Sequence, residues 1–338
     1  MKGGLPLTKR KHPKDTDYLF LSARIRGMER RMMDRSRMER LLQAPTMTEC
    51  AQVLQELGYP PFDPASPDAL NEALAKQRAE MFDDLRRQMP DAAVLDVFRL
   101  PYDYHNLKTL VKSRGSDVKA LLVDAGRVSA DTLLARYQQS GKWDFLPPAM
   151  AQAAAEAERV LAETGDPQRS DFVLDKAYFT ELSQVAKDSG SPFVQSYVRT
   201  LIDAANLRTL VRTQRMHSTG SFLQQVLLDG GQVSVARILA DANRGVAELY
   251  HATALRDVAQ LGQEAAQGGS LTAFEKACDN AVFAAMARSR TVPFGIEVPM
   301  GYIAAREWEL TNLRIILSGR QAGLSADAIR ERLRDSYV

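Results

Sequence analysis

Residues 103–112 read DYHNLKTLVK, residues 203–212 read DAANLRTLVR and residues 309–318 read ELTNLRIILS. In each stretch an acid, an asparagine, a leucine and a base stand at the same relative positions. Self-similarity of this kind indicates repeated structural units. The recurring residues, to which we assign a structural role, are Asp103, Asn106, Leu107, Asp203, Asn206, Leu207, Glu309, Asn312 and Leu313.

Each repeated stretch has the spacing of an amphipathic helix. In the first copy Leu107, Leu110 and Val111 recur at i, i+3 and i+4, which places them on one face. Asparagine is a weak helix former, so its presence in three copies needs a reason. We expect a buried amide that bonds the end of a neighbouring helix, because buried polar groups are normally hydrogen-bonded. The alternative is that the three asparagines surround a central opening.

The base after each leucine lies on the polar side of its helix. Charges in such positions usually face solvent, although a ring of three could also face an acidic partner. The candidate partner-binding residues are Lys108, Arg208 and Arg314.

A second element follows the first two asparagine helices. Residues 121–134 read LLVDAGRVSADTLL and residues 226–239 read VLLDGGQVSVARIL, and we align a third, altered turn at residues 322–325, AGLS. Two elements that recur in the same order predict three homologous units, too long for solenoid repeats, in a pseudo-threefold, funnel-like arrangement. We place them at residues 15–126, 127–231 and 232–338. The last unit ends in a helix from residue 325 that we expect to pack against the first bundle and close the array.

The rest of the chain also predicts an all-α fold. Leu21, Ile25, Met28 and Met32 are spaced by four, three and four residues, and runs of alternating apolar and polar residues typical of strands are missing. Prolines mark the expected breaks between helices. Those we use are Pro45, Pro60, Pro61, Pro64, Pro90, Pro101, Pro147, Pro148, Pro192, Pro293 and Pro299, with Ser129 and Ser325 as N-caps.

The charge is unevenly distributed along the chain, and the cysteine content suggests a protein of a reducing compartment. The net charge is +2, but five bases in residues 1–14 precede the first acid, so the remainder has a net charge of −3. We interpret residues 1–14 as a basic, flexible tail. Cys50 and Cys278 are isolated thiols. No secretory signal and no apolar run long enough to span a membrane is found, so we expect a cytoplasmic protein whose membrane association is peripheral.

Sequence motifs for catalysis are missing. We find no phosphate-binding loop, no paired histidines with metal-ligand spacing and no nucleophile elbow, and we therefore assign no catalytic, cofactor-binding or metal-binding residue. His105 has no counterpart in the other copies and is expected to pack locally. Two alternatives stay open. The basic tail and the arginines at 24–40 suggest a helical nucleic-acid-binding protein, and an enzyme of unrecognised helical fold is the other.

The repeated stretches resemble the C subunit of V/A-type ATPases, called d in eukaryotes. The resemblance rests on YDYHNLK at 102–108, AAREWELTNLR at 304–314, IRERLR at 329–334 and YLFLSARIR at 18–26, and it covers about residues 15–338. The basic tail departs from the family pattern.

The resemblance implies a non-catalytic central-stalk subunit on the inner face of the membrane. Such a protein is funnel-shaped, receives the shaft, made of the D and F subunits, in a socket, sits on the membrane proteolipid ring and transmits torque. Its partners would be this shaft and this ring and not nucleic acid, and it would need no cofactor and no membrane span.

Overall fold

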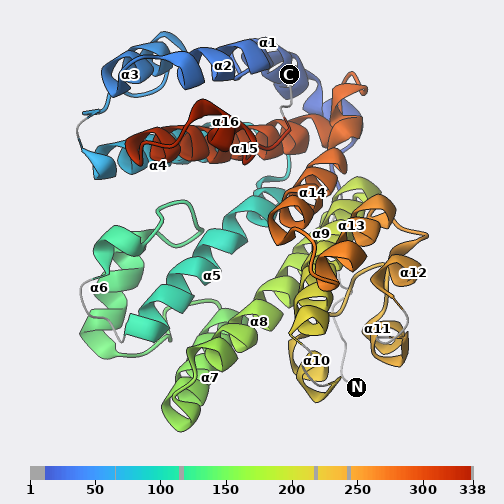
Figure 1. Ribbon diagram of the computed structural model, residues 1–338. Coiled ribbons are helices and arrows are strands. Elements are labelled where there is room, and N and C mark those ends of the chain that lie inside the picture. Colours follow the sequence, from blue (N-terminus) through green and yellow to red (C-terminus); the bar gives the residue numbers. More distant parts are fainter. Residues whose placement is uncertain (1–11, 65, 114–117, 217–219, 242–244, 336–338) are drawn as a thin grey trace.

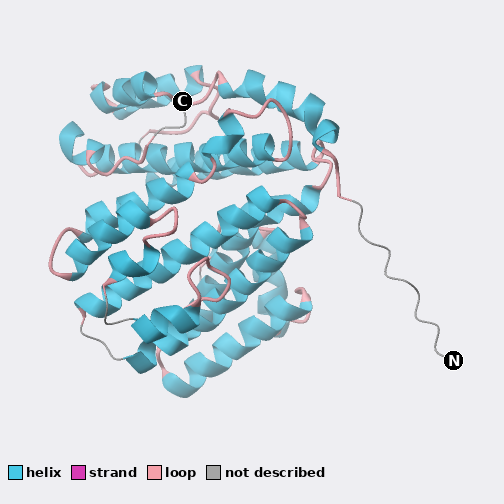
Figure 2. Cartoon of the chain, turned by 90° about the vertical axis from the view of Figure 1, so that its right-hand side faces the viewer, coloured by secondary structure: helices cyan, strands magenta, loops and turns pink. Residues whose placement is uncertain are grey.

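The chain is helical throughout the part that the structure describes. The computed structural model describes residues 12–64, 66–113, 118–216, 220–241 and 245–335, and within these ranges every regular element is a helix. Figures 1 and 2 show these helices joined by loops. The all-α prediction is confirmed, whereas most of the predicted tail, residues 1–11, lies outside the described residues.

We describe the helices in three runs along the chain. The first run precedes α5, which carries Asn106; the second starts at α5; and the third starts at α9, which carries Asn206, and includes α15, which carries Asn312. The first run comprises η1 Asp15–Tyr18, α1 Leu19–Glu29, α2 Arg35–Gln43, α3 Met47–Glu56, α4 Pro67–Arg86 and η2 Ala92–Leu95. The second comprises α5 Asp96–Ser113, η3 Lys119–Leu121, α6 Ala130–Ser140, α7 Pro148–Thr164 and α8 Pro167–Asp188. The third comprises α9 Pro192–Arg215, α10 Gly220–Val226, α11 Val235–Asp241, α12 Val246–Tyr250, α13 Arg256–Ala266, α14 Leu271–Ala284, η4 Ala287–Arg290, α15 Glu297–Gln321 and α16 Ala326–Arg330.

Local sequence explains most helix boundaries. The hydroxyl oxygens of Ser129 and Ser325 accept N–H hydrogen bonds at the first turns of α6 and α16, which confirms the predicted N-caps. Pro148 and Pro192 occupy the first position of α7 and α9, where a missing N–H costs nothing.

Two predicted proline breaks are wrong. α5 continues through Pro101, its sixth residue. One backbone hydrogen bond is lost there, and packing of α5 against α7 and α8 outweighs that loss. Pro299 is the third residue of α15, within the first turn, whose N–H groups have no partner inside the helix.

The asparagine helices α5, α9 and α15 form the frame on which the other helices pack. α5 packs against α7 and α8, α9 packs against α13 and α14, and α15 contacts α1, α2, α3, α4 and α16. Figure 1 shows α1 to α3 along one edge of the molecule, with α15 and α4 beneath them. Helices α1 to α4, which contact α15, therefore come from the opposite end of the chain.

Two apolar clusters form the core. The larger one extends from α1 through α5, α8 and α9 to the first half of α15. The smaller one combines side chains of α2, α3 and the first half of α4 with the second half of α15 and Ile329 of α16. Among the described residues, no helix is both long and apolar enough to cross a bilayer.

Candidate functional site

The three repeated asparagines make the same pair of hydrogen bonds. Each side chain is buried, its Nδ2 donates to a backbone carbonyl, and its Oδ1 accepts the N–H of that same residue. In each case the partner lies further along the chain, after the next short helix, which is η3, α10 or α16. The Nδ2–O and N–Oδ1 distances are 2.9 and 2.8 Å for Asn106 with Val123, 2.8 and 2.9 Å for Asn206 with Leu228, and 3.3 and 2.9 Å for Asn312 with Arg334.

These bonds identify what the amide does. The asparagine fixes a backbone residue that lies outside any helix against its own helix, and not the end of a neighbouring helix as expected. Since both amide groups are satisfied by backbone, the alternative of three asparagines lining an opening has no support in these contacts. His105 lies beside the first of these segments, with Nε2 3.1 Å from the carbonyl of Leu121.

The repeated aspartates hold the turn that comes next. Asp103 Oδ1 accepts the N–H groups of Arg127 (2.8 Å) and Val128 (3.2 Å), and Asp203 accepts those of Gln232 (3.0 Å) and Val233 (3.2 Å). The carboxylates therefore bind the residues that directly precede the N-caps of the next helices.

Residues 126–129 and 231–234 both read Gly-x-Val-Ser, and we call them the Gly-x-Val-Ser turns. The contact with the aspartate explains why each turn begins with glycine. A Cβ atom at Gly126 would lie 2.2 Å from Asp103 Oδ1, and one at Gly231 would lie 2.3 Å from Asp203 Oδ1. Any larger residue would push the buried carboxylate away from its N–H donors.

The third copy is completed by the other end of the chain. Glu309 Oε2 accepts the N–H of Met33 (2.9 Å), which directly precedes Asp34, the N-cap of α2. The other carboxylate oxygen of Glu309 bonds Tyr59 and Arg306, and all three side chains are buried. The longer side chain of glutamate reaches the N–H of Met33 without a glycine beside it.

The turn at residues 322–325 is therefore not the third Gly-x-Val-Ser turn, and our alignment of it is wrong. Gly323 lies at φ 72°, a left-handed conformation that ends α15, and a Cβ there would meet no other residue. The segment bound by Asn312 comes later, at Arg334, and the turn equivalent to Gly126–Ser129 is supplied by residues near Met33.

Burial controls the electrostatics of the two aspartates. Burial raises the pKa of Asp103, and the bonded guanidinium of Arg127 opposes that rise (Nε to Oδ2, 2.8 Å). Burial also raises the pKa of Asp203, opposed only by the two backbone N–H groups, because Gln232 stands where Arg127 stands in the first copy. Arg127 Nη1 also donates a hydrogen bond to Glu181 Oε1 on α8 (2.7 Å). The guanidinium therefore links Asp103 on α5 to α8.

The three candidate partner-binding bases differ in their surroundings. Lys108 is paired with Asp175 of α8 (2.6 Å), and Arg208 is paired with Glu275 of α14 (2.7 Å) and with Asp279. Arg314 is exposed on α15. Two of the bases thus connect an asparagine helix to a later helix of the same group.

We call the contacts of the repeated asparagines and acids with backbone, together with the side chains paired to those acids, joints. Several residues of these joints could not be predicted from the sequence. Arg127 occupies the variable position of the turn motif, and its replacement by Gln232 in the second copy conceals its role. Arg306 and Tyr59 lie 247 residues apart, and no local pattern connects them.

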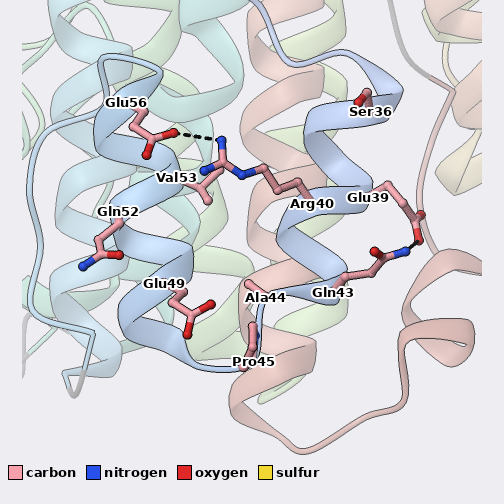
Figure 3. Close-up of a pocket in the computed structure, with 10 residues that line it drawn as sticks. All are labelled: Ser36, Glu39, Arg40, Gln43, Ala44, Pro45, Glu49, Gln52, Val53 and Glu56. Carbon is pink, nitrogen blue, oxygen red and sulfur yellow. Dashed lines mark hydrogen bonds and ion pairs between the residues drawn. The ribbon is translucent and has the colours of Figure 1, made fainter.

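A groove lies between α2 and α3, beside the smaller apolar cluster. Figure 3 shows its ten lining residues, with Arg40 reaching across to Glu56 (2.8 Å). Three glutamates and one arginine line it, a balance unfavourable for a phosphate. In the described part of the chain, no group of three or more His, Cys, Asp or Glu side chains could hold a metal ion. The recurring feature of this protein is therefore a set of buried side chains that bind backbone groups.

The chain is similar over most of its length to C subunits of V-type and A-type ATPases. The chain is 23% identical over 326 residues to the C subunit of the V-type sodium ATPase of Enterococcus hirae, covering 95% of this chain and 99% of the relative. It is 25% identical over 345 residues to the C subunit of the A-type ATP synthase of Methanocaldococcus jannaschii, covering 94% and 86%. It is 23% identical over 335 residues to the C subunit of the V-type ATP synthase of Thermus thermophilus, covering 94% and 98%.

The family match covers the three repeated asparagines and acids. The model of the ATP synthase (C/AC39) subunit family matches residues 21–332, a span that begins before α2 and ends within the segment after α16. The chain therefore belongs to the ATP synthase (C/AC39) subunit family, and it is a subunit of a rotary ATPase.

Proposed function

We propose that this chain is a non-catalytic central-stalk subunit that links the D–F shaft of its ATPase to the membrane proteolipid ring and transmits torque between them. The family match over residues 21–332 is the observation that carries the proposal. A torque-bearing adaptor needs stiff helices held in fixed relative positions. Helices of 18, 24 and 25 residues, each bonded through its asparagine to a loop further along the chain, suit that need.

We propose that three equivalent units are grouped about a common axis and that the protein lies on the inner face of the membrane; the recurring asparagine contacts support the equivalence of the units. We propose that each unit begins at its asparagine helix, so that the boundaries first placed near residues 126 and 231 move to the starts of α9 and α15. The third unit then combines α15 and α16 with α2, α3 and α4. A closed group of this kind resists twisting better than an open one, because no unit has a free end.

The socket for the shaft is the finer part of the proposal. We retain Lys108, Arg208 and Arg314 as candidates, with different weight. Lys108 and Arg208 already neutralise carboxylates within the chain, whereas Arg314 is exposed and can meet an acidic partner.

Binding measurements with the purified D–F shaft test the proposal. The chain should form a complex with the shaft, and Arg314→Glu should weaken it more than Arg237→Glu, a reversal at an exposed base of α11. If reversal of all three candidate bases left shaft binding unchanged, the socket assignment would be wrong. If the unaltered chain bound neither the shaft nor the isolated ring, the central-stalk function itself would be wrong.

A further inference from the structure

Two adjacent large apolar side chains lie exposed at the start of α1. Phe20 is 76% exposed and Leu19 is 48% exposed. The other large apolar side chains that are exposed in the described part of the chain occur singly, which is ordinary for a protein surface. α1 lies at one edge of the molecule, where a partner can approach it (Figure 1).

Phe20 belongs to a row of exposed residues on the outer face of α1. The row consists of Asp17, Phe20, Ala23, Gly27 and Arg31, at intervals of three, three, four and four. Asp17 lies in η1, just before α1, and Arg31 lies just after the end of α1. The opposite face of α1 is buried against the core. The exposed row therefore begins with an acid, ends with a base and has no charge between them.

The fold does not require the glycine of this row. Glycine weakens a helix, and the backbone at Gly27 is helical and not in the left-handed region that favours glycine. A Cβ atom added at Gly27 would meet nothing within 4 Å. Neither backbone conformation nor packing within the described part of the chain explains this residue. Its missing side chain leaves room on the exposed face for a side chain of another molecule.

The row is complementary to itself when it is read in the opposite direction. If a second α1 runs antiparallel to the first, Asp17 of one protomer lies near the partner's Arg31, and Phe20 lies over the partner's Gly27. Both contacts recur on the other side of a twofold axis, which is the arrangement of a symmetric dimer. The small residues Ala23 and Gly27 allow the two helix axes to approach closely.

We propose that two copies of the free chain form a dimer through the outer faces of their α1 helices. Phe20 packs on the partner's Gly27, and Asp17 pairs with the partner's Arg31. Arg24 lies close to the twofold axis, and Asp84 of the same protomer neutralises its charge (2.6 Å). The inference goes beyond the proposed function, because it concerns the chain outside its ATPase.

Charge and shape together favour a second copy as the partner. An acid before a helix and a base after it also suit the dipole of that helix, but the dipole does not account for an exposed phenylalanine or for a glycine. A second copy satisfies the acid, the base, the phenylalanine and the glycine at once. One pair of short helices buries less than the roughly 1,200 Å² of a stable interface, so we expect a weak dimer whose population rises with concentration.

Sedimentation equilibrium of the full-length chain over a range of concentrations tests the proposal. The unaltered chain should populate a dimer below about 1 mM, the weak end of the affinity scale. Phe20→Ser should raise the dissociation constant at least about tenfold, because each dimer loses two buried phenylalanines. Met216→Ser is the matched control at another exposed apolar side chain, at the end of α9, and should leave the dissociation constant unchanged.

Gly27→Leu separates pairing from folding. The larger side chain fills the space for the partner's Phe20 and should weaken the dimer. It should also raise the melting temperature of the monomer, because leucine favours a helix more than glycine does. Thermal unfolding at a concentration where the chain is monomeric measures this second effect. Unchanged or tighter pairing of Gly27→Leu would overturn the proposal.

Charge reversal at low salt identifies the partner. Asp17→Arg and Arg31→Asp should each weaken the dimer by placing like charges opposite each other, and the two changes together should restore it. An exchange of charges within this chain would not restore binding to a different protein.

A chain that stayed monomeric up to about 1 mM would overturn the proposal, as would a double charge variant that pairs no better than the single ones. If the chain stayed monomeric and Phe20→Ser weakened its binding to the purified D–F shaft, this face would belong to the shaft instead. Because sedimentation uses the isolated chain, failure to pair leaves the central-stalk function untouched.

Discussion

At the scale of single residues, one side-chain function recurs three times. An amide within a long helix binds the backbone N–H and C=O of one residue, and an acid one turn earlier binds N–H groups that precede a helix N-cap. Side chains thereby satisfy backbone groups that would otherwise be buried without a partner. The loops after α5 and α9 are therefore positioned by their helices.

Replacing Asn206 with alanine should destabilise the protein. The side chain is fully buried, and its loss leaves the N–H and the carbonyl of Leu228 without partners, at a cost of about 1–3 kcal/mol in the free energy of unfolding. Urea unfolding measures the change. Asn71→Ala, at an exposed asparagine of α4, is the control and should stay within about 0.5 kcal/mol of the unaltered chain. Equal effects of the two substitutions would contradict the role given to the amide.

Asp203 should make stability depend on pH. Burial raises its native pKa above the ordinary aspartate value of about 3.9. Between the two pKa values the native state binds more protons than the unfolded state, so this group's contribution to stability falls as the pH rises. The asparagine side chain of an Asp203→Asn variant cannot ionise, and the variant therefore lacks this dependence.

The free energy of unfolding of Asp203→Asn should improve relative to that of the unaltered chain as the pH rises from about 4 through the native pKa. Urea unfolding at several pH values measures this difference, with Asp144→Asn as the matched change at an exposed acid. Parallel pH curves for the Asp203→Asn variant and the unaltered chain would refute the prediction.

The sequence was a good guide to these positions and a poor guide to their partners. Asp103, Asn106 and Leu107 stand out because their spacing recurs. Hydrogen bonds from a side chain to the backbone leave no mark on the partner's identity, so Val123 could not have been predicted. Only Gly126 carries a signal, because the nearby carboxylate excludes a Cβ atom there.

At the scale of elements, helix existence followed from periodicity and caps, while the assignment of helices to groups did not. α16 illustrates the difference. Its N-cap at Ser325 was evident from the sequence, but its place against α15 and α2 depends on contacts between opposite ends of the chain. Ile329 is buried against Gly319, and Arg330 is paired with Glu39 of α2.

Deleting residues 325–338 should lower the melting temperature by at least about 5 °C. The deletion removes the buried Ile329 and leaves the amide of Asn312 without the backbone of Arg334. Calorimetry measures the shift. Ile329→Ala should reproduce part of it, costing about 2–5 kcal/mol, and Arg332→Ala, at an exposed side chain of the same segment, should have little effect. An unchanged melting temperature after the deletion would show that the segment does not stabilise the third group of helices.

At the scale of the whole molecule, the N-terminal and C-terminal parts form one packed body. The smaller apolar cluster is built from α2, α3 and α4 together with α15 and α16, so neither end of the chain can bury its apolar face alone. Glu309 stands at the junction, where it binds the backbone of Met33 and the side chains of Tyr59 and Arg306. Burial lowers the pKa of the Arg306 guanidinium, but the Glu309 carboxylate outweighs this and leaves it raised.

Glu309→Gln should loosen this body selectively. The substitution keeps the size of the side chain but leaves the guanidinium of Arg306 buried without its charge partner, and breaking such a pair costs about 3–5 kcal/mol. Hydrogen exchange should then quicken in α2, α3 and the second half of α15, while α7 and α8, which lie outside the smaller cluster, should keep their protection. Glu331→Gln, an exposed acid near the same end of the chain, should leave the exchange pattern unchanged. Uniform quickening over all helices would mean that the molecule opens as a single unit, and that Glu309 is not a local joint between the two ends of the chain.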